Sequence, residues 1–284
     1  TYRSNNFRIS THITINSAPT LANLNAIASG GVGSSGAFGG TITVNTGSAI
    51  SLTGSKADLT TIEGAVTFSN NLNGVVNDAS GLTYTNLNTL LGLSDVNGLT
   101  VSAQTDYTET ASNANSLVAL SVASVTTNKI LFNANSQITT GDANFTNTII
   151  NSIFTDTGGK FTEVVINHST TLSGALTIPA SHTLTINASK TVTLSAVLTN
   201  SGTLSNSGTI VFNASSGLTA AGTTTLGGTV TISGASTLTA TGALTITNAF
   251  NVGANTLTLA GAGALSGGAI TLNSGSSVVK KTGS

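Results

Sequence analysis

The stretch from Thr209 to Ile232 reads TIVFNASSGLTAAGTTTLGGTVTI and contains one physical unit twice. Alternating apolar pairs recur in it and beyond it at intervals of 20 residues: Ile210/Phe212, Val230/Ile232, Phe250/Val252 and Ile270/Leu272. Apolar side chains at every second position are typical of a strand that buries one face. The spacing therefore predicts short strands that recur at a constant interval.

Two more apolar positions lie between successive pairs. One series is Leu218, Leu238 and Leu257/Leu259, and the other is Leu226, Leu244/Ile246 and Leu265. Three strands in each interval predict an all-β chain folded as a three-faced parallel β-solenoid, or β-helix, with coils of about 20 residues. A β-sandwich has no reason to keep one interval. We expect Val230, Ile232, Phe250 and Val252 inside the coils, and Thr229, Thr231 and Asn251 outside.

Asparagine directly follows many of the expected strands. The positions are Asn16, Asn45, Asn133, Asn167, Asn187, Asn213 and Asn273, each followed within three residues by a small residue, usually Ser. Asn tolerates the left-handed backbone conformation and bonds the local backbone, so it suits a corner. Stacked corners would form ladders of Asn side chains. The alternative is that Asn is simply abundant in this chain.

Strands of the type Thr183-Leu184-Thr185-Ile186-Asn187 are joined by corners rich in Gly, Ser and Ala. In this they resemble the β-solenoid passenger regions of bacterial autotransporters and of filamentous-haemagglutinin-like surface adhesins. The resemblance covers mainly residues 164–279, and the first half of the chain only loosely. It implies a β-solenoid that is extracellular or lies on a cell surface.

We divide the chain into three parts. Residues 1–16 show a long strand pattern with Phe7, Ile9, Ile13 and Ile15. We expect this segment to act as a donor strand between subunits, the alternative being that residues 7–15 form the first coil of the chain's own solenoid. Residues 17–163 are expected to form irregular solenoid coils with corner insertions, or else a capping region. Residues 164–284 are expected to form the regular solenoid.

The irregular part contains both strand and helix patterns. Ser17 and Pro19 favour a short capped helix with apolar residues at Leu21, Leu24 and Ile27. Two more short helices are expected around residues 87–92 and 117–122. Strand pairs are expected at Ile42/Val44, Ile50/Leu52, Val66/Phe68, Leu82/Tyr84 and Leu99/Val101.

The charged residues argue against an enzyme. Only 6% of the residues are charged, there is no Cys, and all nine acids lie at or before Glu163. Acid-base chemistry on a glycan needs carboxylates, so the regular part cannot supply such a site. Asp106 and Glu109, on either side of Tyr107, are the best carboxylate pair and lack a basic neighbour in the sequence. We expect no catalytic site.

We also expect no cofactor and no metal centre. Gly31, Gly33 and Gly36 have a dinucleotide-binding spacing without the strand and helix that this motif needs. An isolated calcium site at Asp142 or Asp156 stays open. The basic residues are too few for a nucleic-acid surface, and the apolar runs are too short for a membrane-spanning helix.

Three functions fit these features. The first is an extracellular structural protein whose copies join head to tail into a filament or surface layer. The second is a monomeric surface adhesin that binds a glycan or a host surface. The third is an ice-binding protein, for which the outward residues Thr209/Val211, Thr229/Thr231, Ala249/Asn251 and Ala269/Thr271 give only a broken Thr array.

The first function predicts a self-assembly contact between the two ends of the chain. Solenoid ends expose unpaired backbone groups and a slice of apolar core. We therefore expect the contact to use Phe7, Ile9, Ile13 and Ile15 from the N-terminal strand, and Ile270, Leu272 and Val278 from the C-terminal end.

Overall fold

The fold is mostly β-strand, arranged in parallel sheets, with a smaller helical part. The computed structural model describes residues 13–28 and 41–246 apart from 235 and 243, and beyond them the backbone of strands within residues 250–280. Every strand pairing in these parts of the chain is parallel. The expectation of a β-rich parallel fold is therefore confirmed.

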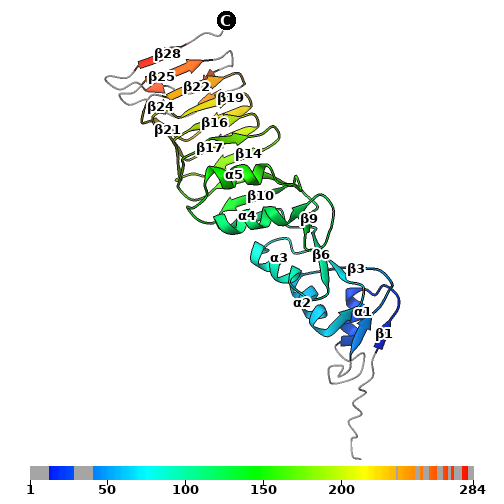
Figure 1. Cartoon of the computed structure of the whole chain (residues 1–284). Helices are drawn as coiled ribbons and strands as arrows, with labels where there is room; N and C mark the ends of the chain where they lie inside the picture. Colours follow the sequence, from blue (N-terminus) through cyan, green and yellow to red (C-terminus); the bar gives the residue numbers. More distant parts are fainter. Residues whose placement is uncertain are drawn as a thin grey trace, which may run out of the picture. The chain divides into compact units, whose positions relative to one another are not determined.

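The chain divides into two compact units. The N-terminal unit comprises residues 1–105 and 120–134, and the C-terminal unit comprises residues 106–119 and 135–284. Figure 1 shows the described strands and helices of both units.

The described residues of the N-terminal unit form two sheets and three helices. Sheet 1 has the order β1 (Ile13–Ile15), β2 (Ile42–Val44), β4 (Val66–Phe68). Sheet 2 has the order β3 (Ile50–Gly54), β5 (Leu72–Val76), β6 (Val96–Val101), β9 (Ile130–Phe132), β8 (Ser121–Val122). The helices are α1 (Leu21–Ala28), α2 (Lys56–Ala65) and α3 (Tyr84–Leu91).

The C-terminal unit contains three longer sheets. Sheet 3 has the order β26 (Leu265–Gly267), β23 (Leu244–Ile246), β20 (Thr223–Leu226), β17 (Thr203–Asn206), β14 (Thr183–Ile186), β11 (Phe161–Ile166), β10 (Ser136–Thr140), β7 (Asp106–Glu109). Sheet 4 has the order β12 (Thr170–Leu172), β15 (Thr191–Leu194), β18 (Thr209–Phe212), β21 (Thr229–Ile232), β24 (Phe250–Asn251), β27 (Ile270–Thr271). Sheet 5 has the order β13 (Leu176–Ile178), β16 (Val197–Asn200), β19 (Gly217–Ala220), β22 (Ser236–Ala240), β25 (Thr256–Ala260), β28 (Ser277–Lys280). Helices α4 (Ala111–Leu120) and α5 (Asn147–Phe154) complete the set.

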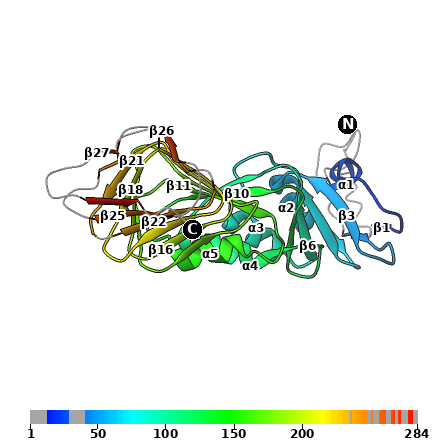
Figure 2. The same ribbon diagram turned by 90° about the horizontal axis from the view of Figure 1, so that it is seen from above.

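From β12 onward the chain enters the three sheets in strict rotation, sheet 4, then sheet 5, then sheet 3. Figure 2 shows the chain of this unit passing from one sheet to the next around a common interior. The register agrees with the interval of 20 residues, since Ile210 pairs with Val230, Val230 with Phe250, and Phe250 with Ile270. We call one passage of the chain through sheets 4, 5 and 3 a round. Each strand thus pairs with the equivalent strand of the previous round.

The core is built from the inward-facing rows of these strands. Ile210, Phe212, Val230 and Ile232 are at most 1% exposed, whereas Thr229 is exposed. The predicted burial of Val230 and Ile232 is confirmed. Val252 and the side chain of Phe250 lie outside the described residues.

The corner asparagines differ in part from the prediction. Asn187 donates from Nδ2 to Oδ1 of Asn167 at 3.2 Å, which makes one rung of the predicted ladder. The left-handed conformation, however, falls on Ser189 and Ser215 rather than on Asn187 and Asn213, so that part of the prediction was wrong. The reason is that both asparagines still donate their backbone N–H to the previous round, to Ile166 O and Leu194 O, and so remain in the extended ladder.

Glycine at other corners is required by the close stacking of rounds. Gly208 and Gly228 precede β18 and β21, and Thr229 N donates to Gly208 O at 2.8 Å. A Cβ atom at Gly228 would overlap the carbonyl oxygen of Gly208. Only a residue without a side chain fits there.

The helices required several corrections. The N-cap of α1 is Thr20, whose Oγ1 accepts from Asn23 N at 3.2 Å, and not Ser17. The strand expected at Leu82/Tyr84 is absent because Thr83 caps α3 and forms a capping box with Asn86. The helix expected at 117–122 begins earlier, at Ala111, and gives way to β8 after Leu120.

Two helices were not expected at all. In α2, Ser55 and Asp58 form a capping box, in which Ser55 Oγ accepts from Asp58 N and the Asp58 carboxylate accepts from Ser55 N. In α5, Ile150, Ile153 and Phe154 are buried at helical spacing. Both signals are present in the sequence, and the alternation of the neighbouring strands concealed them.

We predict that Val230→Asp strongly destabilises the C-terminal unit. The side chain at this position is fully buried in a row of apolar residues, so the substitution buries an unpaired charge and costs several kcal/mol. The measurement is urea unfolding followed by circular dichroism. Thr229→Asp, one residue away and exposed, is the control and should change the free energy of unfolding by less than about 0.5 kcal/mol. Equal effects of the two substitutions would contradict the assigned faces.

Candidate functional site

The N-terminal candidates for self-assembly lie partly in β1. Ile13 and Ile15 are half-buried and pair with Ile42 and Val44 of β2, so this part of the N-terminal strand belongs to a sheet of its own chain. Ile13 N donates to Thr41 O at 3.0 Å, and Asn45 N donates to Ile15 O at 2.8 Å. Phe7 and Ile9 lie outside the described residues.

β1 is also the outermost strand of sheet 1. Because Ile13 and Ile15 direct their backbone groups toward β2, the alternation of a parallel ladder directs the N–H and C=O of Thr14 to the opposite side. In sheet 1 as the structure describes it, no strand lies on that side.

The C-terminal candidates lie in the last strands of two sheets. Ile270 is in β27, the final strand of sheet 4, and Val278 is in β28, the final strand of sheet 5. They pair with Phe250 and Leu257 on their inner sides. Leu272 lies outside the described residues. The structure thus places one group of candidates at an edge of the N-terminal unit and the other at the last edges of the C-terminal unit.

The best carboxylate pair of the sequence is separated by strand alternation. In β7, Asp106 is exposed whereas Glu109 is only 2% exposed, because residues three apart on a strand point to opposite faces. Asp106 Oδ1 accepts from Thr139 Oγ1 at 3.2 Å. Two carboxylates on opposite faces cannot act on one substrate bond. That the protein is not an enzyme stays a prediction.

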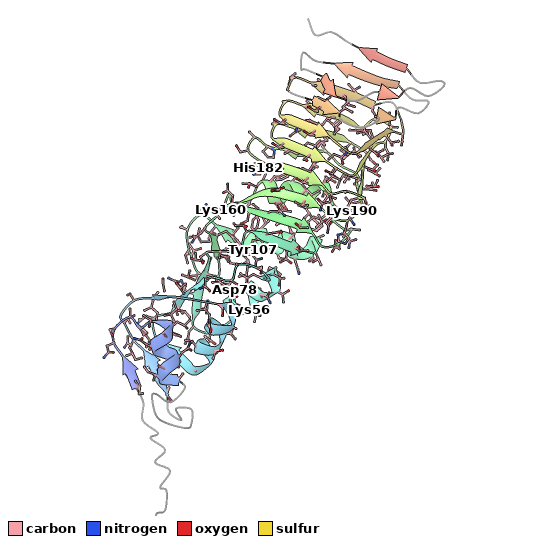
Figure 3. All side chains as sticks on the ribbon, turned by 180° about the vertical axis from the view of Figure 1, so that it is seen from behind. Lys56, Asp78, Tyr107, Lys160, His182 and Lys190 are labelled. Atoms are coloured by element: carbon pink, nitrogen blue, oxygen red, sulfur yellow. The ribbon has the colours of Figure 1, made fainter. Side chains whose placement is uncertain are left out.

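Tyr107 lies between these acids and points into the core. It is fully buried and packs edge-on against Phe161, with ring centroids 5.9 Å apart. Burial, and to a lesser extent the charge of Glu109, raises the pKa of Tyr107 well above its usual value near 10. Figure 3 shows Tyr107 within the C-terminal unit.

The two aspartates considered for calcium bind backbone amides instead. The Asp142 carboxylate accepts from Ala111 N and Asn144 N, and the Asp156 carboxylate accepts from Gly158 N, Lys160 N and Phe161 N. Asp142 therefore ties its own turn to the first residue of α4, and Asp156 stabilises a local turn. In the described parts of the chain no three His, Cys, Asp or Glu side chains are grouped to hold a metal ion. Lys160 and Lys190 lie on opposite sides of the unit in Figure 3.

Sheet 3 carries an array of hydroxyl groups that the sequence analysis missed. Its register aligns Thr183, Thr203 and Thr223 in one outward column. A second outward column contains Thr185, Ser205, Thr225 and Thr245. These side chains are half-buried or exposed. The outward pair Thr183/Thr185 was visible in the sequence, whereas the broken Thr array expected from the 20-residue interval lies on sheet 4, where Val211 and Asn251 interrupt the columns.

Three polar residues stand in otherwise apolar rows of the core. Asn200 lies between Ile178 and Ala220, Asn206 between Ile186 and Leu226, and Thr224 between Leu204 and Leu244. Asn200 Nδ2 donates to Thr223 O and to Thr224 Oγ1, both at 2.9 Å. This bond joins one round of the chain to the next inside the core. The sequence signal was the interruption of each apolar row.

The comparisons with known proteins add no relative. No family model, no curated protein and no solved structure matches the chain. None of the helices in the described parts of the chain has the length and hydropathy that a bilayer crossing requires.

We predict that Tyr107 makes the C-terminal unit sensitive to alkaline pH. Its pKa is raised in the folded state, so its contribution to stability is complete below the unfolded pKa near 10 and is lost as the pH rises above that value. The loss is about 1.4 kcal/mol per pH unit. The measurement is urea unfolding at pH 9 and pH 11 for the wild type and for Tyr107→Phe, whose ring keeps the packing and cannot ionise. If the two proteins lose the same stability between these pH values, the assignment is wrong.

Proposed function

We propose that the chain is a three-faced parallel β-solenoid that acts as an extracellular structural protein, whose copies join head to tail into a filament or a surface layer. The observation that carries the proposal is the strict rotation of the chain through sheets 4, 5 and 3 from β12 to β28. A chain that returns to each sheet in every round builds a stack with two different ends.

The two different ends favour a head-to-tail contact. The last strands β26, β27 and β28 each pair with one neighbour in the described structure, and β1 is the outer strand of sheet 1. Unpaired strand edges readily pair with another chain. Two nonidentical surfaces that pair without closing a ring generate a filament.

The low charge of the chain also favours assembly. The formal net charge is −1 for 284 residues, and after Glu163 no acid remains. Little electrostatic repulsion therefore opposes the stacking of one copy on another. A weakly charged chain of stacked parallel strands suits a structural element outside the cell.

We predict that Thr14→Pro reduces assembly without unfolding the protein. Proline removes the N–H that faces away from β2, and β2 uses the groups of Ile13 and Ile15 instead. Negative-stain electron microscopy and sedimentation should show filaments of the wild type and mostly single particles of the variant. Thr14→Val, which keeps the N–H, is the matched control. Filaments of normal length formed by a folded Thr14→Pro variant would exclude β1 as the contact.

Ice binding is a second candidate, and the hydroxyl array of sheet 3 favours it. Neighbouring strands are about 4.8 Å apart, and alternate residues along a strand are about 6.7 Å apart, so the Thr and Ser side chains of β14, β17 and β20 form a regular lattice. Glu163 accepts from Thr185 Oγ1 at 3.1 Å and so brings one carboxylate to the border of this lattice. Such a lattice can order a layer of water.

Thermal hysteresis measures this second function. If sheet 3 binds ice, the wild type separates the melting and freezing temperatures, and Thr203→Tyr in the centre of the array removes most of the difference. Thr229→Tyr, on the interrupted face of sheet 4, should leave it unchanged. No hysteresis from the wild type at millimolar concentration would exclude ice binding.

A further inference from the structure

Helix α5 lies against the first strand of sheet 5. β13 pairs with β16 on one side, and on its other side the α5 side chains bond its backbone. Asn151 Nδ2 donates to Ala175 O at 3.1 Å, and Asn151 Oδ1 accepts from Thr177 N at 3.0 Å. Asn147 Oδ1 accepts from Gly174 N at 3.1 Å.

The bonds of Asn151 reproduce those of a neighbouring strand. In a parallel ladder, one residue bonds the C=O before and the N–H after the residue opposite it. Asn151 does the same with its side-chain amide, because Ala175 and Thr177 flank Leu176. The helix therefore satisfies the edge that an added strand would otherwise occupy.

The rest of α5 holds this amide in place. Ile150, Ile153 and Phe154 are buried beneath the helix, and the Phe154 ring meets the His182 ring at a centroid distance of 5.4 Å. Pro179, which has no N–H to offer a further strand, directly follows β13. The edge is thus covered by a helix and ended by proline, two devices that prevent strand addition.

We propose that α5 closes this end of sheet 5 against a second copy of the chain. The strand it excludes is β28 of that copy, because β28 is the opposite end of the same sheet and would continue it in parallel. The closure of sheet 5 by α5 does not depend on the proposed function, whereas its consequence for assembly rests on it. If copies join head to tail, α5 prevents the contact at β13 and leaves the edge of β1 to receive the next copy.

The test removes both amides from the full-length chain without weakening the helix. Alanine is the best helix former, so Asn147→Ala/Asn151→Ala keeps α5 and deletes its bonds to β13. Thr148→Ala, an exposed position of the same helix, is the control. Two readouts are needed: amide hydrogen exchange at Thr177, and the oligomeric state by light scattering after size exclusion.

The expected result has two parts. Exchange at Thr177 should accelerate roughly tenfold in the double variant, as expected for the loss of one hydrogen bond, and remain unchanged at Thr199 in β16. The variant should also form oligomers in proportion to its concentration, beyond those of the wild type and of Thr148→Ala, because a helix held only by the packing of Ile150, Ile153 and Phe154 can be displaced from β13 by an incoming strand. Unchanged exchange would show that α5 is no cap. Faster exchange without added association at millimolar concentration would show that it does not block a second copy.

A cysteine pair identifies the strand that enters. The chain contains no Cys, so Ala175→Cys and Val279→Cys introduced into the double variant report only their own contact. The register of sheet 5 aligns Val279 with Val197 in one column. Ala175 directly precedes Leu176, the partner of Leu198, and therefore lies opposite Val197 in the same column. A β28 strand placed beside β13 brings residues 175 and 279 together. Oxidation should link copies through residues 175 and 279. Oligomers that do not cross-link would rule out β28 as the excluded strand. This result is independent of wild-type filaments, whose absence would refute the proposed function alone.

Discussion

The need of every parallel strand for a partner on both edges is the constraint on which this structure depends. A strand uses half of its backbone groups on each side, and an unpaired buried group costs about 1 to 3 kcal/mol. Within the C-terminal unit the rotation through three sheets provides a new partner about 20 residues later. The ends of the sheets have no such partner, so the chain must treat them separately.

The chain treats its edges in different ways. At β13 a helix supplies side-chain amides in place of a strand. At β1 the groups of Thr14 face away from the sheet, and β26, β27 and β28 end sheets whose inner strands are all paired. An asymmetry of this kind gives a stack a direction. This asymmetry is the physical ground on which the proposal of a head-to-tail contact rests.

The close stacking of rounds also limits which residue types fit in the core of the C-terminal unit and at its corners. Rows of Ile, Val, Leu and Phe fill the interior, and glycine is required where one round touches the backbone of the next, as at Gly228. Asn200 and Thr224 are exceptions inside the core. Their hydrogen bond connects two rounds whose apolar rows are otherwise alike. A buried polar pair that must meet is a means of specifying register in a repetitive core.

The sequence by itself determined the interval of 20 residues, the alternation of buried and exposed positions, and the burial of Val230 and Ile232, because strand period and burial are local properties of the chain. The capping boxes of α2 and α3 are also local sequence signals, but the alternation of apolar residues beside them led to no helix being expected at α2 and to a strand at Leu82/Tyr84. Only the tertiary structure decided that Asn187 stays extended, that Glu109 rather than Asp106 faces the interior, and that Asn151 meets the edge of β13. These outcomes depend on hydrogen bonds between residues 20 or more positions apart, or on the face that a strand turns inward. Neither is contained in the local pattern.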